Sequence, residues 1–374
     1  MKISYNWLRD YLDFDAQPDE LSSVLTSLGL EVEDVEEWVS VKGGMKGVVI
    51  GRVLTCERHP DADRLSVTTV DAGGTEPLHI VCGAPNVAAG QVVAVALPGT
   101  MVFHGNEQYE IRKSKIRGQL SEGMICAEDE LGLGADHEGI MVLDSSARIG
   151  MPAAEYFGVT TDTVFEIGLT PNRIDCSSHF GVARDLAAFY NLQRPVRAKL
   201  PEIYGFRKER DRGVIKVTVE APDACIRYSG LTVRGIRVGP SPAWLQTRLR
   251  AIGLNPINNV VDITNFVLHE TGQPLHAFDA AAVTGDTVRV RHLPDKTKFV
   301  TLDGVERTLA PSDLMICNRD EGMCIAGVFG GLRSGVTEAT TDLFLESATF
   351  SPVSVRRTSR RHDLHTDASY RFER

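Results

Sequence analysis

The stretch VVIGRVLTCERHPDADRLSVTTVDAGG, residues 48–74, decides the fold of the first part of this chain. Its two ends are rich in β-branched residues, and a turn-forming His-Pro-Asp sequence separates them. Similar runs follow downstream, in the order LHIVCG, QVVAVALPGT, YEIRKSKIRG and GIMVLD. Roughly five or six short strands within about 110 residues favour a small closed β-barrel, and the OB fold has that size.

Helical patterns flank the predicted barrel. Ser4 is placed to cap a helix, and Pro18 stands where a second helix begins. The acidic alternation EVEDVEEW then predicts a strand. Beyond the barrel, LTPNRIDCSSHFGVARDLAAFYNLQ again has apolar residues at helical spacing. We therefore predict that an OB-fold barrel, residues 43–150, is inserted into a small helical domain made of residues 1–42 and 151–195.

Residues 196–374 combine both patterns. The run IKVTVEAPDACIRYSGLTVRGIRV alternates as strands do, and SPAWLQTRLRAIGL has an apolar helical face that ends at Gly253. A basic segment, SPVSVRRTSRR, predicts a helix after Pro352. This region is therefore expected to be a mixed α+β domain, and the whole chain an α+β multidomain protein.

Composition and charge limit the function. The formal net charge of −10 and the pI near 5.5 argue against broad coating of nucleic acid, but they permit a local basic face. No apolar run approaches the ~20 residues of a membrane helix. The N-terminus MKISYNWLRDYLDF carries acids where a secretory signal is apolar, so we expect a cytoplasmic protein that does not enter membranes.

The seven cysteines are scattered and never form a CxxC pair. An odd number of widely spaced cysteines is not a disulfide framework, and the spacing does not suit structural zinc. We expect buried, reduced thiols and no metal site.

A basic alternation stands out within the predicted barrel. Lys113, Lys115 and Arg117 occupy every second position of KSKIRG, so a strand would point all three side chains to one face. Such a face could contact an RNA phosphate backbone. An edge strand protected by lysines explains the same pattern equally well.

Polar residues interrupt apolar runs of the third region. Glu346 follows Phe344 and Leu345, so it lies either at a strand edge that faces water or in a polar pocket. His276 in QPLHAFD is either a structural histidine or a catalytic one. Gly327 in AGVFGG either brings the backbone close to a ligand or forms a tight turn.

The chain resembles a known family. The segments quoted from the barrel, with IVCGAPNVAAGQVVAVALPGT and KIRGQLSEGMICAEDELGL, are similar to the tRNA-binding OB module of the EMAP II type. With their flanks, in order, they resemble the β subunit of bacterial phenylalanyl-tRNA synthetase. The flanking motifs are MKISYNWLRDYL, EIGLTPNRIDCSSHFGVARDLAA, NNVVDITNFVLHETGQPLHAFD, AGVFGG, LESATF and HTDASYRFER.

The resemblance covers essentially the whole chain and implies a site. In that family the third region is an editing domain, which hydrolyses tyrosine wrongly attached to tRNA(Phe). Glu346 would accept a hydrogen bond from the tyrosine hydroxyl, and His276 would place or polarise the attacking water. Thr264, Asn265, Thr366 and Ala368 also match the family's site and would hold the ester and the terminal adenosine. Gly327 matches a further position of the pocket.

The resemblance also implies partners. Ligation with ATP and Mg²⁺ would belong to a separate alpha subunit, in an assembly of two alpha and two beta subunits that binds tRNA(Phe). This chain would be an N-terminal part of the beta subunit and would hold no cofactor itself. The alternative function is a non-catalytic scaffold for RNA binding and assembly. The sequence leaves the oligomeric state of this part, and the contact of its barrel with tRNA, open.

Overall fold

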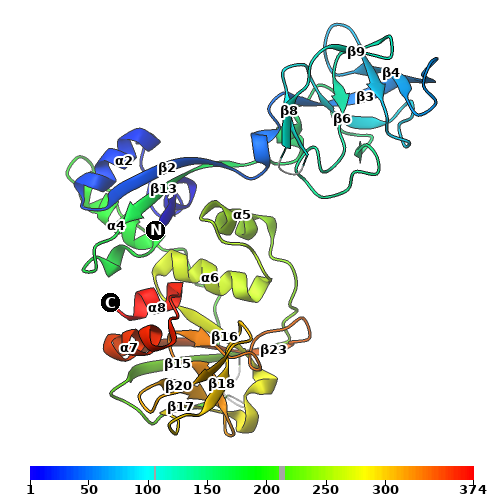
Figure 1. Cartoon of the computed structure of the whole chain (residues 1–374). Helices are drawn as coiled ribbons and strands as arrows, with labels where there is room; N and C mark the ends of the chain where they lie inside the picture. Colours follow the sequence, from blue (N-terminus) through cyan, green and yellow to red (C-terminus); the bar gives the residue numbers. More distant parts are fainter. Residues whose placement is uncertain (105–106, 210–214) are drawn as a thin grey trace. The chain divides into compact units, whose positions relative to one another are not determined.

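The computed structural model describes residues 1–104, 107–209 and 215–374 (Figure 1). The chain folds into two compact units. The first consists of Met1–Glu36 and Thr163–Arg374, and the second of Glu37–Asp162. In the part of the chain that is described, no helix has the length and apolar character needed to cross a bilayer.

The second unit contains the expected barrel-like sheet. Its strands pair antiparallel in the order β11-β6-β3-β4-β5, and β12 also pairs with β6. The backbone N–H of Glu122 donates to the oxygen of His79 at 2.7 Å, so the segment before β11 reaches β5 and nearly closes the sheet. The strands are β3 (Val48–Arg58), β4 (Ser66–Asp71), β5 (Leu78–Cys82), β6 (Val92–Ala96), β11 (Met124–Ile125) and β12 (Val142–Leu143).

The sequence of β3 explains the curvature of this sheet. A Cβ on Gly51 would lie 2.7 Å from a methyl of Val95 and 3.0 Å from one of Val70, so only glycine allows this close approach. A register shift between Val53 and Thr55 adds a bulge, which bends the strand further.

Among the described residues of this unit, two small strand pairs and two short helices accompany the sheet. The strand pairs are β7 (Met101–His104) with β8 (Glu107–Glu110), and β9 (Ser114–Ile116) with β10 (Gln119–Ser121). The helices are η1 (Lys42–Met45) and α3 (Ala153–Tyr156).

The first unit begins with more sheet than the sequence predicted. Ser4 caps the first helix and Pro18 opens the second, as expected. Before and after these helices, however, strands form a three-stranded sheet in the order β1-β13-β2, so the predicted helical domain is a mixed one. The sequence did not predict β1 and β13, because these strands pair with each other across more than 150 residues of chain, as Lys2 does with Glu166. The elements are β1 (Lys2–Ser4), α1 (Tyr5–Leu8), α2 (Pro18–Ser27), β2 (Glu31–Val39), β13 (Thr161–Gly168), η2 (Ile174–Cys176) and α4 (His179–Tyr190).

The rest of the first unit holds two larger sheets, as the α+β prediction requires. One has the order β14-β17-β20-β21-β22, with β14 parallel to β17, and the other has the order β15-β23-β16. The strands are β14 (Lys216–Val219), β15 (Cys225–Arg234), β16 (Leu275–Asp279), β17 (Thr287–His292), β20 (Leu314–Cys317), β21 (Gly322–Ile325), β22 (Phe329–Gly330) and β23 (Asp342–Phe350), besides the hairpin of β18 (Lys298–Val300) and β19 (Glu306–Thr308).

Four α-helices and two short 3₁₀ helices belong to the same region. They are α5 (Ala243–Ala251), α6 (Asn259–Thr271), η3 (Ala280–Ala282), η4 (Thr284–Asp286), α7 (Pro352–His362) and α8 (Asp367–Phe372). The predicted helix after Pro352 is thus confirmed, with proline as its first residue.

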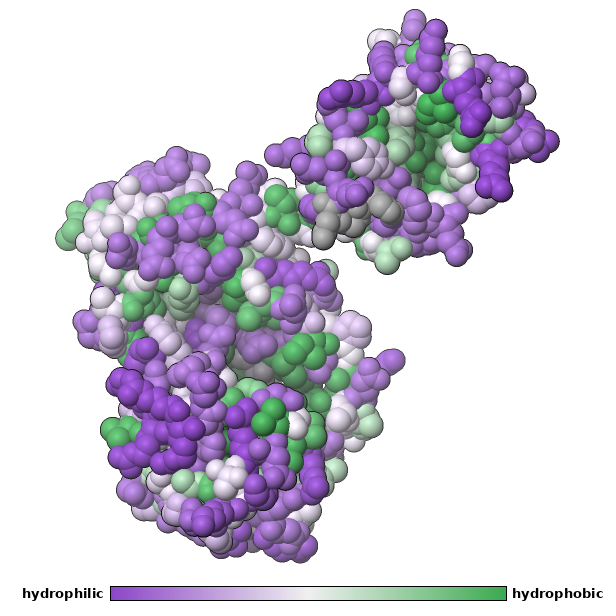
Figure 2. All heavy atoms as spheres, viewed as in Figure 1, coloured by the Kyte–Doolittle hydropathy of each residue, from purple (hydrophilic) through white to green (hydrophobic). Residues whose placement is uncertain are grey.

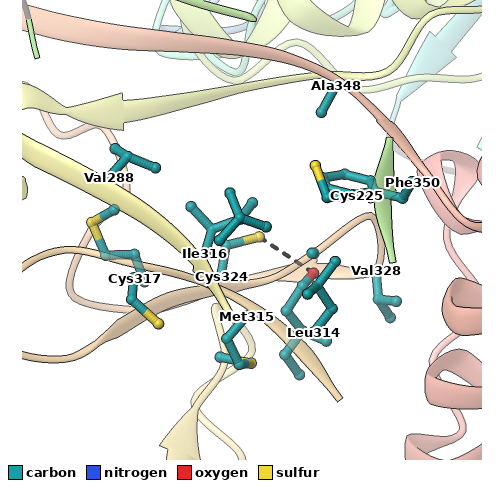
Figure 3. Close-up of a cluster of buried hydrophobic side chains, with 14 of the residues drawn as sticks. Cys225, Val288, Leu314, Met315, Ile316, Cys317, Cys324, Val328, Ala348 and Phe350 are labelled. Atoms are coloured by element: carbon teal, nitrogen blue, oxygen red, sulfur yellow. Dashed lines mark hydrogen bonds between the residues drawn. The ribbon is translucent and has the colours of Figure 1, made fainter. Parts of the chain in front are cut away.

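A single apolar core joins the two larger sheets. It contains Phe344 and Ala348 of β23 together with residues of β20 and β21. Figure 3 shows the thiols of Cys225, Cys317 and Cys324 among these apolar side chains. All seven cysteines are free thiols; six of them are buried, as the sequence predicted, whereas Cys56 is half-buried.

Strand β23 is covered on both faces. Phe344 and Ala348 point into the core between the sheets, whereas Leu343 packs with Val260 of α6 on the opposite face. Because side chains alternate along a strand, Glu346 points to the same face as Phe344 and Ala348. The central place of β23 therefore rules out the exposed strand edge that the sequence left open for this residue.

Candidate functional site

Glu346 and His276 lie side by side on two adjacent strands. In the antiparallel pair of β16 and β23 they are direct partners, and on the other side of β23 the partner of Glu346 is Gly230 of β15. Directly opposed residues of an antiparallel pair have Cβ atoms about 5 Å apart on one face of the sheet. The fold therefore brings together the two residues that carry the predicted chemistry, which are 70 positions apart in the chain.

Glu346 is buried, with 5% of its surface exposed. Its Oε2 accepts a hydrogen bond of 2.7 Å from the phenol of Tyr228 on β15. Burial raises the pKa of Glu346 to about 8, and the hydrogen bond from Tyr228 offsets part of this rise. At neutral pH the carboxyl group is therefore mostly protonated, in keeping with a polar group enclosed by a core.

His276 carries an unpartnered ring nitrogen. Its Nε2 is fully enclosed, and among the described residues it has no hydrogen-bond partner. Its ring stands edge-on to Phe278 at a centroid distance of 4.5 Å. Burial lowers the pKa of His276 to about 4, so the imidazole is neutral at pH 7. Enclosed polar atoms almost always have a partner, so this nitrogen is suited to a bound water or a substrate atom.

Glycine at position 330 makes room for this ring. A Cβ on Gly330 would lie 2.8 Å from Cε1 of His276 and 2.7 Å from a methyl of Leu302. Any larger residue at position 330 would displace the imidazole. The orientation of His276 therefore depends on the AGVFGG segment as well as on β16.

The same segment carries the predicted residue Gly327. It adopts a φ of 70° between β21 and β22, and a Cβ there would lie 3.1 Å from a methyl of Val355 on α7. Thr366 caps α8 and donates a hydrogen bond of 3.0 Å to the backbone oxygen of Val328. Ala368 lies in the first turn of α8. The structure thus groups Gly327, Thr366 and Ala368 around one loop, which leads through β22 to His276.

Thr264 and Asn265 occupy a different place. Both lie on α6, where the hydroxyl of Thr264 donates to the backbone oxygen of Val261 at 2.7 Å. One turn earlier, Val260 packs with Leu343 and Ala277. Leu343 and Ala277 point away from the face that carries Glu346 and His276, so the structure does not bring Thr264 and Asn265 onto that face.

The predicted basic strand of the barrel is shorter than expected. Only Lys115 lies in a strand, β9, whereas Lys113 precedes it and pairs with Glu122 at 3.0 Å. Arg117 and Gly118 form the two-residue turn to β10, with φ values of 46° and 87°. The prediction of one alternating strand over residues 113–117 is therefore wrong, because two successive positive φ angles give a tight hairpin turn instead. All three basic residues are exposed.

Two cavities lie away from the predicted editing residues. One of about 600 Å³ in the barrel unit is lined by Ser114 and Ile116 of β9, so Lys115 between them points elsewhere. The other, of about 390 Å³, lies by β18 and the end of β22, with Phe299 and Gly331 in its wall. Neither His276 nor Glu346 lines either of these two cavities.

One group of residues has the composition of a metal site. Oxygen and sulfur atoms of Asp175, Cys176 and Asp185 lie within 4.8 Å of one another. The guanidinium of Arg173 donates to all three through Nη2. A positive charge of the protein itself therefore already offsets part of this acidic charge and occupies its ligand atoms.

Sequence reasoning missed Tyr228 and Gly330. Tyr228 stands two residues before Gly230 in an alternating run, so its direction follows only from the register of β15 against β23. Gly330 lies in the quoted motif AGVFGG, but its contact with His276 depends on the pairing of β21 with β22. Local patterns do not contain these registers.

Two domain families match the chain. Residues 48–152 match a domain described as a putative tRNA binding domain, and residues 224–374 match a B3/4 domain. The barrel-like sheet lies within the first match, and the Glu346–His276 pair lies within the second. Fold and site therefore define a protein that combines a tRNA-binding type of barrel with a B3/4 domain.

The chain belongs to the phenylalanine–tRNA ligase beta subunit family. It is 58% identical to the beta subunit of Bacteroides thetaiotaomicron over 376 residues and 57% identical to that of Porphyromonas gingivalis over 378 residues. Both matches cover 100% of this chain and 46% of the relative, so the chain spans about half the length of these curated relatives. Among solved structures, an N-terminal fragment of the phenylalanyl-tRNA synthetase beta subunit from Pyrococcus horikoshii aligns with 54% of this chain and 62% of that chain, at a TM-score of 0.30 and 14% identity.

Proposed function

We propose that this chain is part of a phenylalanine–tRNA ligase beta subunit that binds tRNA(Phe) and removes wrongly attached tyrosine by hydrolysis. The observation that carries the proposal is the cross-strand pair of the buried Glu346 and of His276, with its enclosed Nε2, inside the matched B3/4 domain. Ligation, with ATP and Mg²⁺, is assigned to the alpha subunit in a cytoplasmic assembly of two alpha and two beta subunits.

The proposal divides the chain into three domains. Residues 43–150 are the OB-fold barrel for tRNA, inserted between residues 1–42 and 151–195, and residues 196–374 are the editing domain. The compact unit Glu37–Asp162 and the family match of residues 48–152 support the insertion. Lys113, Lys115 and Arg117 are proposed as RNA contacts because all three side chains are exposed.

A second site is needed because phenylalanine and tyrosine differ by one hydroxyl. An apolar pocket rejects an analogue with an added hydroxyl by a factor on the order of a hundred. A polar pocket reverses this selection. Glu346 uses Oε2 for Tyr228, and among the described residues Oε1 has no protein partner, so the phenol of a bound tyrosine can take that position. Phenylalanine would leave the group unpaired at a cost of roughly 1–3 kcal/mol.

Hydrolysis needs a positioned water and a proton acceptor. The neutral imidazole of His276 offers the enclosed Nε2, which can accept a proton from water as the water attacks the ester carbonyl. The imidazolium then gives this proton to the leaving ribose oxygen as the ester bond breaks, so the products are free tyrosine and a tRNA with its terminal hydroxyl restored. Gly327, Thr366 and Ala368 are proposed to hold the terminal adenosine. The expected role of Thr264 and Asn265 at the ester is not proposed, because α6 packs on the opposite face of the sheet from Glu346 and His276.

The decisive experiment compares the hydrolysis of preformed Tyr-tRNA(Phe) and Phe-tRNA(Phe). We expect the wild-type chain to release tyrosine selectively. Glu346→Ala should lose the preference for Tyr-tRNA(Phe), and His276→Ala should hydrolyse Tyr-tRNA(Phe) much more slowly. The assay is repeated with the complete subunits. If tyrosine release is absent there too, or is unchanged in both variants, the editing function is wrong and the scaffold function takes its place.

A further inference from the structure

Helix α7 has a buried side that is fully paired. Val355, Thr358 and Ser359 are buried, and Thr358 donates a hydrogen bond of 3.0 Å to Oδ1 of the fully enclosed Asp313. Arg361 and His362 contact the same carboxylate at 2.5 Å and 2.8 Å. One buried acidic residue beneath the helix therefore pairs with the exposed Arg361 and with the enclosed His362.

The outer side of α7 carries unpaired positive charge. Arg356, Arg357 and Arg360 are exposed, and within residues 1–104, 107–209 and 215–374 no ion pair involves them. Arg360 lies one turn from both Arg356 and Arg357, at i+4 and i+3, so the three side chains lie on one side of the helix and form a surface that we call the arginine face. Figure 2 shows a strongly hydrophilic area over α7.

Such a surface is unusual for this chain. The net charge is −10, and many other arginines pair with a neighbouring acid, as Arg319 does with Asp320 and Arg333 does with Glu321. Three adjacent arginines without acids repel one another, so their clustering calls for a polyanionic partner. Arginine is well suited to phosphate because its planar group donates two parallel hydrogen bonds.

The arginine face also lies next to the proposed site. On the inner side of the same helix, Val355 contacts the loop of Gly327. The chain then continues from α7 through Thr366 into α8, which returns to that loop. An RNA whose end reaches Gly327 and Thr366 would therefore pass close to α7.

We propose that the arginine face of α7 binds backbone phosphates of the tRNA and so holds its acceptor end at the B3/4 domain. This inference rests on the proposed function, since it names the surface that brings the substrate to the site. Its chemistry predicts binding that weakens with salt and that does not depend on the base sequence.

The test measures the affinity of unacylated tRNA(Phe) for the 374-residue chain by fluorescence anisotropy at several salt concentrations. The variant carries Arg356→Gln, Arg357→Gln and Arg360→Gln. A plot of log K against log salt has a negative slope, and each lost phosphate contact reduces its magnitude by about 0.7–0.9. We therefore expect the magnitude of the slope to decrease by roughly two to three in this variant. A matched variant, with Lys298→Gln, Arg319→Gln and Arg333→Gln, removes the same charge from exposed, acid-paired residues and should leave the slope nearly unchanged.

The outcomes separate this inference from the editing function. An arginine-face variant with the wild-type slope, or a wild-type chain that does not bind tRNA, would overturn the inference. So would a variant that keeps its salt slope but no longer assembles with the alpha subunit, because the face would then be a protein interface. Rescue of the slope by Arg→Lys at the three positions would support a charge effect. A chain that binds tRNA through this face but releases no tyrosine would refute editing alone.

Discussion

At the scale of single residues, burial decides the chemistry of Glu346. Its place in the central strand β23 encloses it, and Tyr228 satisfies one oxygen. The sequence alone is compatible with two places for this residue, an exposed strand edge and a polar pocket. Burial in a strand depends on what covers the strand, which in this chain includes β20 and β21, distant in sequence.

Replacing Glu346 by glutamine should change the pH dependence of stability. The pKa of Glu346 is about 8 in the folded chain against an ordinary 4.5, so the folded state binds its proton more tightly. The stability linked to this proton is complete below about pH 4.5 and is lost as the pH rises through about 8. The glutamine of Glu346→Gln stays neutral at every pH. The unfolding free energy of this variant relative to wild type should therefore increase between pH 5 and pH 9, by an amount on the order of a few kcal/mol.

Urea unfolding at pH 5, 7 and 9 checks this prediction. The control is Glu306→Gln, because Glu306 is an exposed residue of the β18–β19 hairpin. A difference between Glu346→Gln and wild type that stays constant with pH would show that Glu346 is not protonated in the folded state.

At the scale of elements, one histidine joins several of them. Nε2 of His179, at the start of α4, accepts from the backbone N–H of Ser4 at 3.0 Å, and Nδ1 donates to the backbone oxygen of His269 at 2.9 Å. The ring also stacks on Trp7 at 4.0 Å. β1, α1, α4 and α6 are therefore connected through a single neutral imidazole. The caps at Ser4 and Pro18 were predictable because they are local, whereas this connection was not.

His179→Ala should destabilise the chain by roughly 2–4 kcal/mol at pH 7, because it leaves two enclosed backbone groups unpaired. Burial lowers the pKa of His179 to about 3, so the unfolded chain gains a proton that the folded chain excludes as the pH falls below 6.5. The cost of the substitution should therefore shrink between pH 6.5 and pH 4.

Chemical unfolding at pH 7 and pH 4.5 measures this cost. His365→Ala serves as the control, since that side chain is exposed. An equal cost of His179→Ala at both pH values would contradict the neutral, buried imidazole.

At the scale of the whole molecule, the apolar cores respect the division into two units. The two cores of the barrel unit draw only on residues between 37 and 162, and the larger cores draw only on the remaining chain. Separate cores allow separate unfolding.

We therefore expect two thermal transitions in calorimetry of the intact chain. Residues 37–162 expressed alone should fold and reproduce one of them, at a melting temperature within a few degrees. If the intact chain shows one transition, and the isolated segment remains unfolded, the two units depend on each other for stability.

The sequence by itself determined those structural features that depend only on residues close together in the chain. Strand-forming runs placed the barrel, caps and prolines placed α1, α2 and α7, and the ordered motifs identified the family. Turn geometry at Arg117 and the strands β1 and β13 escaped this reading, because hairpin and sheet pairing set them.

Only the tertiary structure decided the site. It made β23 a central strand, set Glu346 opposite His276, supplied the Tyr228 phenol and turned Arg356, Arg357 and Arg360 outward. It also placed Thr264 and Asn265 on a helix that packs on the other face of the sheet. The physical reason is that strand register and burial arise from contacts between segments far apart in the chain, where a shift of one residue would turn every side chain to the opposite face.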